Sequence, residues 1–135
     1  MTEIPQVTFD FDAILADASA AAGLDDFGDD SFREPLKVLL NALDTEANLT
    51  LAGRAGQYER LRNLLINRLK VEGWISRHPE ILDEKIEAPV VIVGLQRTGS
   101  TYLHRILASD TRFYAPLWYE VRNPAPDLDW DFVSK

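Results

Sequence analysis

Leucine and alanine residues recur at helical spacing through the first half of the chain. An alanine-rich stretch from Asp12 to Ala22 follows an aspartate cap candidate and predicts a short helix that ends at Gly23. Residues 31–35 contain a serine, an early glutamate and an early proline, which is typical of a helix start. The leucines that follow share one helical face, which we expect to pack inward: Leu36, Leu39, Leu40 and Leu43.

The longest predicted helix runs from about Thr50 to Arg77. Its apolar stripe has three- and four-residue steps and contains Tyr58, Leu61, Leu65 and Leu69, with Trp74 and Ile75 extending it. His78 ends this helix because a residue before a proline avoids the helical region of backbone space. Residues 1–88 are therefore expected to form a helical N-terminal region.

The pattern changes after Pro89. Val90 to Val93 is an unbroken β-branched run without polar alternation, which is typical of a strand buried on both faces of a parallel sheet. A helix is predicted from Gly99 to Ser109, with Leu103, Ile106 and Leu107 facing that sheet. The aromatic and proline-rich sequence after Asp110 predicts no regular structure.

These elements indicate an α/β protein with a parallel sheet of the P-loop type and flanking helices, preceded by the helical region. The predicted division is residues 1–88 and residues 89–135, the second being the start of a P-loop-like domain. A buried parallel strand needs neighbours joined by long crossovers, and the chain offers no second convincing strand. We therefore expect the sheet to be incomplete and the 135 residues to be the N-terminal part of a longer enzyme.

The segment from Gly94 to Thr101 joins the predicted strand to the predicted helix and has the features of a phosphate-binding loop. Free backbone amides at a helix N-terminus, together with the helix dipole, favour an anion. Gly94 and Gly99 keep the five-residue spacing of nucleoside triphosphatase loops, but Ser100 stands where those loops have lysine. Arg97 is the one cation of the loop, and its planar guanidinium suits a phosphate or sulfonate oxygen.

Residues 94–105, Gly-Leu-Gln-Arg-Thr-Gly-Ser-Thr-Tyr-Leu-His-Arg, resemble the 5′-phosphosulfate loop of sulfotransferases, particularly the arginine-bearing bacterial branch. Gln96 departs from that family's proline, a change that removes no hydrogen-bond donor. The resemblance implies transfer of a sulfuryl group from 3′-phosphoadenosine-5′-phosphosulfate (PAPS) to a hydroxyl or amine, with Arg97 assisting the transfer. It implies donor binding by Arg97, Thr98, Gly99, Ser100 and Thr101, and demands no metal.

Some members of the resembling family place a glutamate base after this loop and its helix, and Glu120 is the candidate here. Its aromatic neighbours would desolvate the carboxylate and raise its pKa. A surface glutamate explains the same position equally well. His104 is a second candidate base that also suits a packing role. Arg105 and Arg112 could approach the donor, although pairing with Asp110 would explain them too.

Composition narrows the function classes. A net charge of −8 argues against general binding to nucleic acid, because such binding needs a basic face. The chain has no cysteine, which excludes thiolate metal sites and disulfides, and the start of the sequence lacks the features of a secretory signal. No stretch is long and apolar enough for a membrane span, so we expect a cytoplasmic protein.

Three functions remain open at this stage. The first is a sulfotransferase acting on a small-molecule, lipid or glycan acceptor. The second is a nucleotide-binding or kinase relative with a degenerate P-loop, which would require magnesium and a lysine from elsewhere. The third is an inactive truncated chain that acts at most as a binding module.

Overall fold

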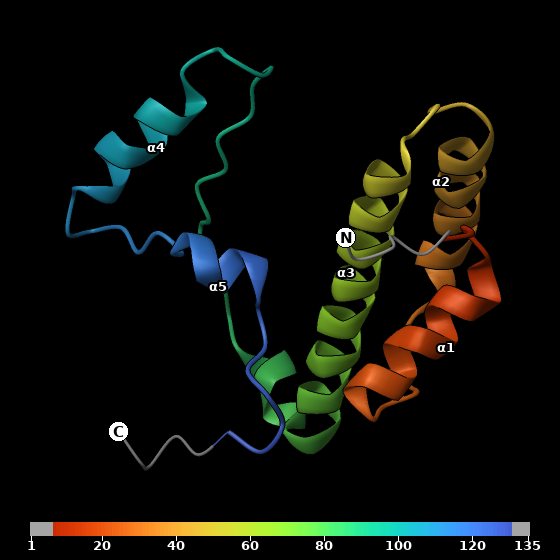
Figure 1. Cartoon of the computed structure of the whole chain (residues 1–135). Coiled ribbons are helices and arrows are strands. Elements are labelled where there is room, and N and C mark those ends of the chain that lie inside the picture. The colour runs from red at the N-terminus through yellow and green to blue at the C-terminus, as the bar shows by residue number, and fades with distance from the viewer. Residues whose placement is uncertain (1–6, 131–135) are drawn as a thin grey trace.

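The computed structural model describes residues 7–130, and these residues form helices joined by extended segments (Figure 1). The helices in chain order are α1 (Phe11–Ala22), η1 (Asp30–Phe32), α2 (Arg33–Thr45), α3 (Leu51–Arg77), η2 (Pro79–Asp83), α4 (Ser100–Ala108) and α5 (Trp118–Arg122), where η marks a 3₁₀ helix. Helices α1, α2 and α3 pack together, whereas α4 stands apart from them in Figure 1. The predicted helices of the N-terminal region are confirmed to within a few residues.

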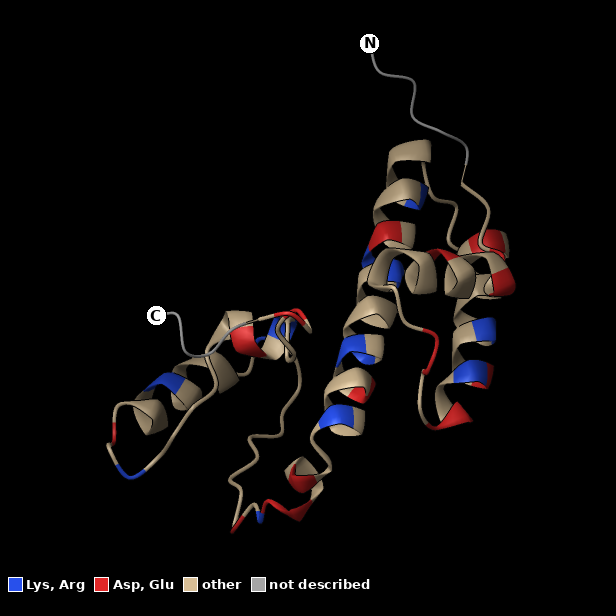
Figure 2. Cartoon of the chain, turned by 90° about the horizontal axis from the view of Figure 1, so that it is seen from below, with Lys and Arg blue, Asp and Glu red and all other residues tan. Residues whose placement is uncertain are grey.

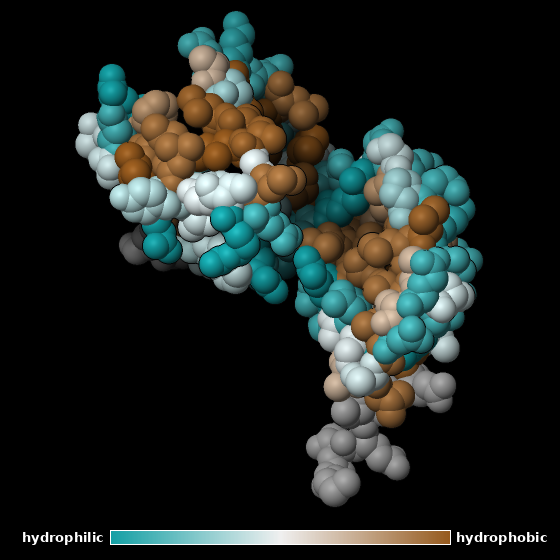
Figure 3. All heavy atoms as spheres, turned by 90° about the horizontal axis from the view of Figure 1, so that it is seen from above, coloured by the Kyte–Doolittle hydropathy of each residue, from teal (hydrophilic) through white to brown (hydrophobic). Residues whose placement is uncertain are grey.

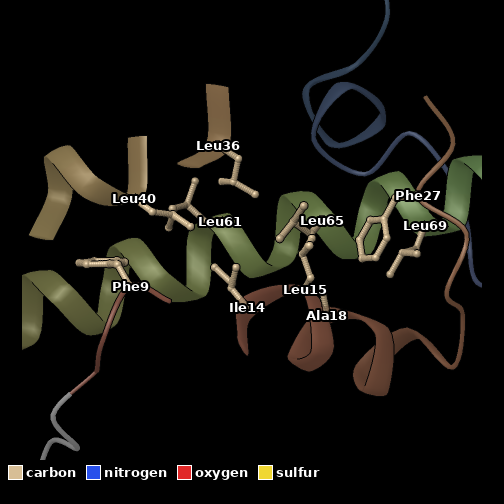
Figure 4. Close-up of a cluster of buried hydrophobic side chains, with 10 residues drawn as sticks. All are labelled: Phe9, Ile14, Leu15, Ala18, Phe27, Leu36, Leu40, Leu61, Leu65 and Leu69. Carbon is tan, nitrogen blue, oxygen red and sulfur yellow. The ribbon is translucent and has the colours of Figure 1, made fainter. Parts of the chain in front are cut away.

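The core lies where α1 and α2 pack onto α3. Figure 4 shows its side chains converging from these three helices and from the segments next to them. The buried members are Phe9, Ile14, Leu15, Ala18, Phe27, Leu36, Leu40, Leu61, Leu65 and Leu69. The predicted stripe of α3 is therefore its core face from Tyr58 to Leu69, but Trp74 and Ile75, which were expected to extend it, are not part of the core. The prediction for α2 is correct for Leu36 and Leu40, and Leu43 packs against the core. Leu39 was expected to pack inward but is exposed to solvent.

Side-chain caps explain where these helices begin. The Asp10 carboxylate accepts a hydrogen bond from the Ala13 amide at 2.8 Å, and the Thr50 hydroxyl accepts one from the Gly53 amide at 3.1 Å. Each cap satisfies an amide that has no acceptor within its own helix. At the other end of α1, the Gly23 amide donates to the Ser19 carbonyl at 2.8 Å, so Gly23 ends that helix as predicted.

The prediction of a parallel sheet with flanking helices is wrong for this chain. No strand or sheet is present among residues 7–130, and Val90 to Val93 form an isolated extended segment. Val91 is 75% exposed and Val93 is 89% exposed, although the sequence indicated burial on both faces. The physical reason is that a strand forms only with a partner, and no other described segment pairs with this one.

Helix α4 shows the same lack of a covering layer. It begins one residue later than predicted, at Ser100, and none of its residues is buried. Leu103 and Ile106, which were expected to face a sheet, are exposed, and Leu107 is partly exposed. Brown, hydrophobic spheres accordingly gather on the lobe that contains the extended segment and α4 (Figure 3).

The segment of residues 122–128, here called the docked segment, lies against the C-terminal half of α3. Three α3 side chains donate to its main-chain carbonyls: Asn67 Nδ2 to Arg122 at 2.8 Å, Trp74 Nε1 to Pro126 at 2.9 Å and Arg77 to Leu128 at 2.7 Å. Lys70 Nζ also contacts the Asp127 carboxylate at 2.5 Å. Ala125 is buried in this segment. These contacts fix α5, whose last residue is the first of the docked segment, relative to the helical region.

Candidate functional site

The candidate loop is a tight turn between the extended segment and α4. Arg97 has a φ of 67° and Gly99 a φ of 90°, so the backbone enters the left-handed region twice within three residues. This conformation is disfavoured for arginine and readily adopted by glycine. The Thr98 hydroxyl donates to the Leu95 carbonyl at 2.7 Å across the turn. A Cβ at Gly94 would lie 3.0 Å from that hydroxyl oxygen, so the turn favours glycine there.

The N-terminus of α4 is open toward solvent. Gly99 is the N-cap residue and no side chain caps this helix. The Gly99 carbonyl accepts from the amides of Tyr102 and Leu103, both at 3.0 Å. Within the described part of the chain, the amides of Ser100 and Thr101 have no acceptor. They are the free donors that the loop pattern predicts.

An open hollow of about 600 Å³ lies over this loop and helix start. The loop residues that line it are Gln96, Arg97, Gly99, Ser100 and Thr101, and α4 adds Tyr102 and Arg105. Thr98 was also predicted to bind the sulfuryl donor, but it does not line the hollow. Its hydroxyl instead donates to the Leu95 carbonyl within the turn.

The electrostatics of this hollow favour an anion. Neither Arg97 nor Arg105 forms a salt bridge within residues 7–130, and no acidic side chain lines the hollow. Two guanidinium groups and two free amides therefore face the same space. Charge-assisted hydrogen bonds from such groups bind phosphate or sulfate oxygens strongly.

Glu120 lies in α5, a short helix where the sequence predicted no regular structure. Its Oε2 accepts hydrogen bonds from the Leu117 amide at 2.6 Å and from the Tyr114 hydroxyl at 3.1 Å. The hydrogen bond to the Glu120 carboxylate raises the pKa of Tyr114 above its usual value. The neighbouring rings of Trp118 and Tyr119 are exposed, whereas Glu120 itself is partly buried.

A second open hollow, of about 570 Å³, contains Glu120. Its walls include Tyr119 and Trp130 as aromatic surfaces and Asn67, Lys70 and Asn123 as polar groups. The structure thus brings the glutamate together with Asn67 and Lys70 of α3, which lie 53 and 50 positions earlier in the chain. No described contact joins Glu120 to the loop at Arg97.

The remaining candidates have local partners or solvent around them. The Arg112 guanidinium contacts the Asp110 carboxylate at 2.6 Å, and hydrogen bonds from Arg112 lower the pKa of Asp110. This is the pairing that the sequence left open. His104 is exposed on α4. His78 stacks on Trp74 with ring centroids 5.4 Å apart, and its amide donates to the Trp74 carbonyl at the end of α3.

Residues 7–130 show neither a metal-binding cluster nor a membrane-spanning helix. Those residues contain no cluster of three or more histidine or acidic side chains that could hold a metal ion. None of their helices is both long and apolar enough to cross a membrane.

Comparisons with known proteins place this loop in a family. A model of the sulfotransferase family matches residues 89–132, which include the loop, α4 and α5. The structure of the sulfotransferase STF1 from Mycobacterium tuberculosis H37Rv is similar to this chain, with a TM-score of 0.79 and 38% sequence identity. Residues 89–132 match the sulfotransferase family, and the chain is similar to part of one of its members. The resemblance drawn from residues 94–105 is thereby confirmed.

The similarity to STF1 extends well beyond the sulfotransferase loop. It covers 85% of this chain, so it includes much of the helical N-terminal region. It covers 32% of the STF1 chain, so this chain spans about a third of that relative. No curated protein matches the chain.

Sequence reasoning missed the α3 residues that surround Glu120 and the docked segment. Asn67, Lys70, Trp74 and Arg77 follow one another at steps of three and four residues, which places them on one face of α3. In the sequence, Asn67, Lys70 and Arg77 form a polar row beside the apolar stripe, to which Trp74 was assigned. The sequence did not show that this face of α3 binds the docked segment, because that segment lies about 50 residues further along the chain.

Proposed function

We propose that this chain carries the donor-binding loop of a PAPS-dependent sulfotransferase that transfers a sulfuryl group to a hydroxyl or amine. The observation that carries the proposal is the coincidence of the family match with an open, cationic helix start at residues 97–101. Because the chain spans about a third of STF1, the activity is assigned to the complete enzyme.

The proposed donor site follows from the free groups of the loop. The amides of Ser100 and Thr101 and the guanidinium of Arg97 would bind oxygens of the 5′-phosphosulfate. The acceptor oxygen or nitrogen attacks sulfur while the bond between sulfur and the bridging phosphate oxygen breaks. Arg97 would stabilise the negative charge that develops on the bridging oxygen, which is electrostatic catalysis without a covalent intermediate.

We propose Glu120 as the base that takes the proton of the acceptor. The Leu117 amide donates to Oε2, and the Tyr114 hydroxyl lies 3.2 Å from Oε1 and 3.1 Å from Oε2, so the carboxylate is held in one orientation. Each carboxylate oxygen has more than one lone pair, so Oε1 can still accept a further hydrogen bond. The hollow beside it, with Tyr119 and Trp130 in its walls, would hold the acceptor. A general base must lie within hydrogen-bond reach of the proton that it removes, so this role requires the acceptor to contact Glu120.

We also propose a boundary at residues 88 and 89 between the helical region and the donor-binding region. The family match begins at residue 89, and the buried core of the helices involves only residues before it. In this view residues 7–88 form a scaffold, and the docked segment connects that scaffold to Glu120.

Calorimetric titration with 3′-phosphoadenosine-5′-phosphate, the product of the donor, tests the loop. We expect binding that does not depend on magnesium and that Arg97→Ala weakens roughly tenfold to a hundredfold, as for the loss of a charge-assisted contact. Arg112→Ala is the matched control, because that arginine pairs with Asp110 outside the hollow. Magnesium-dependent preference for ATP would instead support a kinase relative, and binding of neither would support a module without donor-binding capacity.

A further inference from the structure

We infer that the groove between α3 and α5 is an anion-binding subsite that holds a carboxylate, phosphate or sulfate group of the acceptor. The inference rests on the proposed function, because it assigns a class of acceptor to the region next to Glu120. The groove has a volume of about 420 Å³, which is within the range of small-molecule sites.

The walls of this groove come from two elements. Helix α3 contributes Arg60, Asn63, Asn67 and Lys70, which lie on one face at steps of three and four residues. Helix α5 and the residue after it contribute Arg122 and Asn123. Figure 2 shows basic bands along α3 and on α5, in a chain whose net charge is −8.

The charge of the groove is positive and largely unpaired. No acidic side chain lines it. Lys70 is neutralised by Asp127 at 2.5 Å, but neither Arg60 nor Arg122 forms a salt bridge within residues 7–130. Arg60 and Arg122 are exposed guanidinium groups that line one groove without a carboxylate partner, so an anion bound there would be attracted to both.

Arg122 also has a restricted orientation that suits an oxyanion. The Arg122 guanidinium lies over the Trp118 ring, 5.2 Å from its centroid, which restricts its orientation before any ligand arrives. The backbone beneath it is held by Asn67, whose Nδ2 donates to the Arg122 carbonyl. A guanidinium presents paired N–H groups that match the oxygens of a carboxylate, phosphate or sulfate.

The position of the groove connects it to the proposed reaction. Arg122 is two residues from Glu120, and the groove shares Asn67, Lys70 and Asn123 with the hollow that contains Glu120. An acceptor with its hydroxyl or amine at Glu120 can therefore extend a charged group into the groove. Leu64 and Val121 add apolar surface beside the arginines, which suits the uncharged body of such a molecule.

The test is a nuclear magnetic resonance titration of the full chain that follows the arginine Nε–H signals, after addition of 3′-phosphoadenosine-5′-phosphate in excess. The probes are glucose 6-phosphate, glucuronate and uncharged glucose. We expect saturable shifts at Arg60 and Arg122 with the two anionic probes and none with glucose. Arg60→Gln and Arg122→Lys should each weaken binding about tenfold, because the first removes a charge and the second keeps the charge but loses the fork.

Controls separate the groove from the loop and from general charge screening. Arg112→Gln should leave probe binding unchanged, since Arg112 is paired with Asp110 and lies outside the groove. Non-saturable shifts of similar size at all exposed arginines, or shifts confined to Arg97 and Arg105, would overturn the inference. If the bisphosphate fails to bind the loop while Arg60 and Arg122 still respond, the proposed function falls and the assignment of the groove to an acceptor falls with it.

Discussion

Replacement of Leu69 by alanine should strongly destabilise the helical region. Leu69 is 0% exposed in α3 and belongs to the core shared with α1. Truncation to alanine removes three carbon atoms, which at about 0.8 kcal/mol each accounts for roughly 2.4 kcal/mol of lost transfer free energy. The cavity that remains adds a further penalty, so the total loss in unfolding free energy should be about 3–5 kcal/mol.

The assay for Leu69→Ala is thermal unfolding followed by far-ultraviolet circular dichroism. A loss of this size should lower the unfolding midpoint by roughly 10 °C or more for a domain of this length. Leu64→Ala is the matched control, because Leu64 lies on the same helix but is 54% exposed. The control should change the unfolding free energy by less than about 1 kcal/mol. Equal shifts for the two variants would refute the assignment of the core face of α3.

Three further predictions concern hydrogen bonds. Asp10→Ala removes the cap of α1 and should cost about 1 kcal/mol of stability, measured by urea denaturation. Glu120→Gln should lower the pKa of Tyr114, because the hydrogen-bonded carboxylate raises it, and ultraviolet titration of tyrosine will show the change. Hydrogen bonds from the Ser31 side chain and amide lower the folded-state pKa of Asp29 below 3.8. The stability from this carboxylate is present above its unfolded pKa and is lost as the pH falls through the folded pKa, so Asp29→Asn should flatten the acid limb of the stability curve.

The elements that the sequence predicted correctly depend on contacts between residues close in the chain. Asp10 and Thr50 cap helices through residues three positions away, and the stripe of Leu61, Leu65 and Leu69 repeats within a single helix. The loop was also recognisable, because the spacing of Gly94 and Gly99 reflects a turn within eight residues. Such features can be predicted from the sequence because all the residues that form them lie within one short segment.

The elements that the sequence predicted wrongly or missed depend on distant partners. Val90 to Val93 has the composition of a buried strand, but composition does not supply a neighbouring strand. Helix α5 is short, and the Asn67 side chain that contacts its last carbonyl lies 55 residues away. Short helices have little stability of their own, so such an element becomes visible only once its tertiary contacts are known.

The docked segment has a consequence for how this protein tolerates substitution. Three of the α3 donors bind main-chain carbonyls, at Arg122, Pro126 and Leu128, and a carbonyl is present whichever residue stands there. These bonds therefore place little constraint on the side chains of the docked segment. The donors on α3 have no such freedom, because alanine at Asn67 or Arg77 removes the bond altogether. Random mutagenesis with selection for folded protein should accordingly accept more replacements at Arg122, Pro126 and Leu128 than at Asn67 and Arg77.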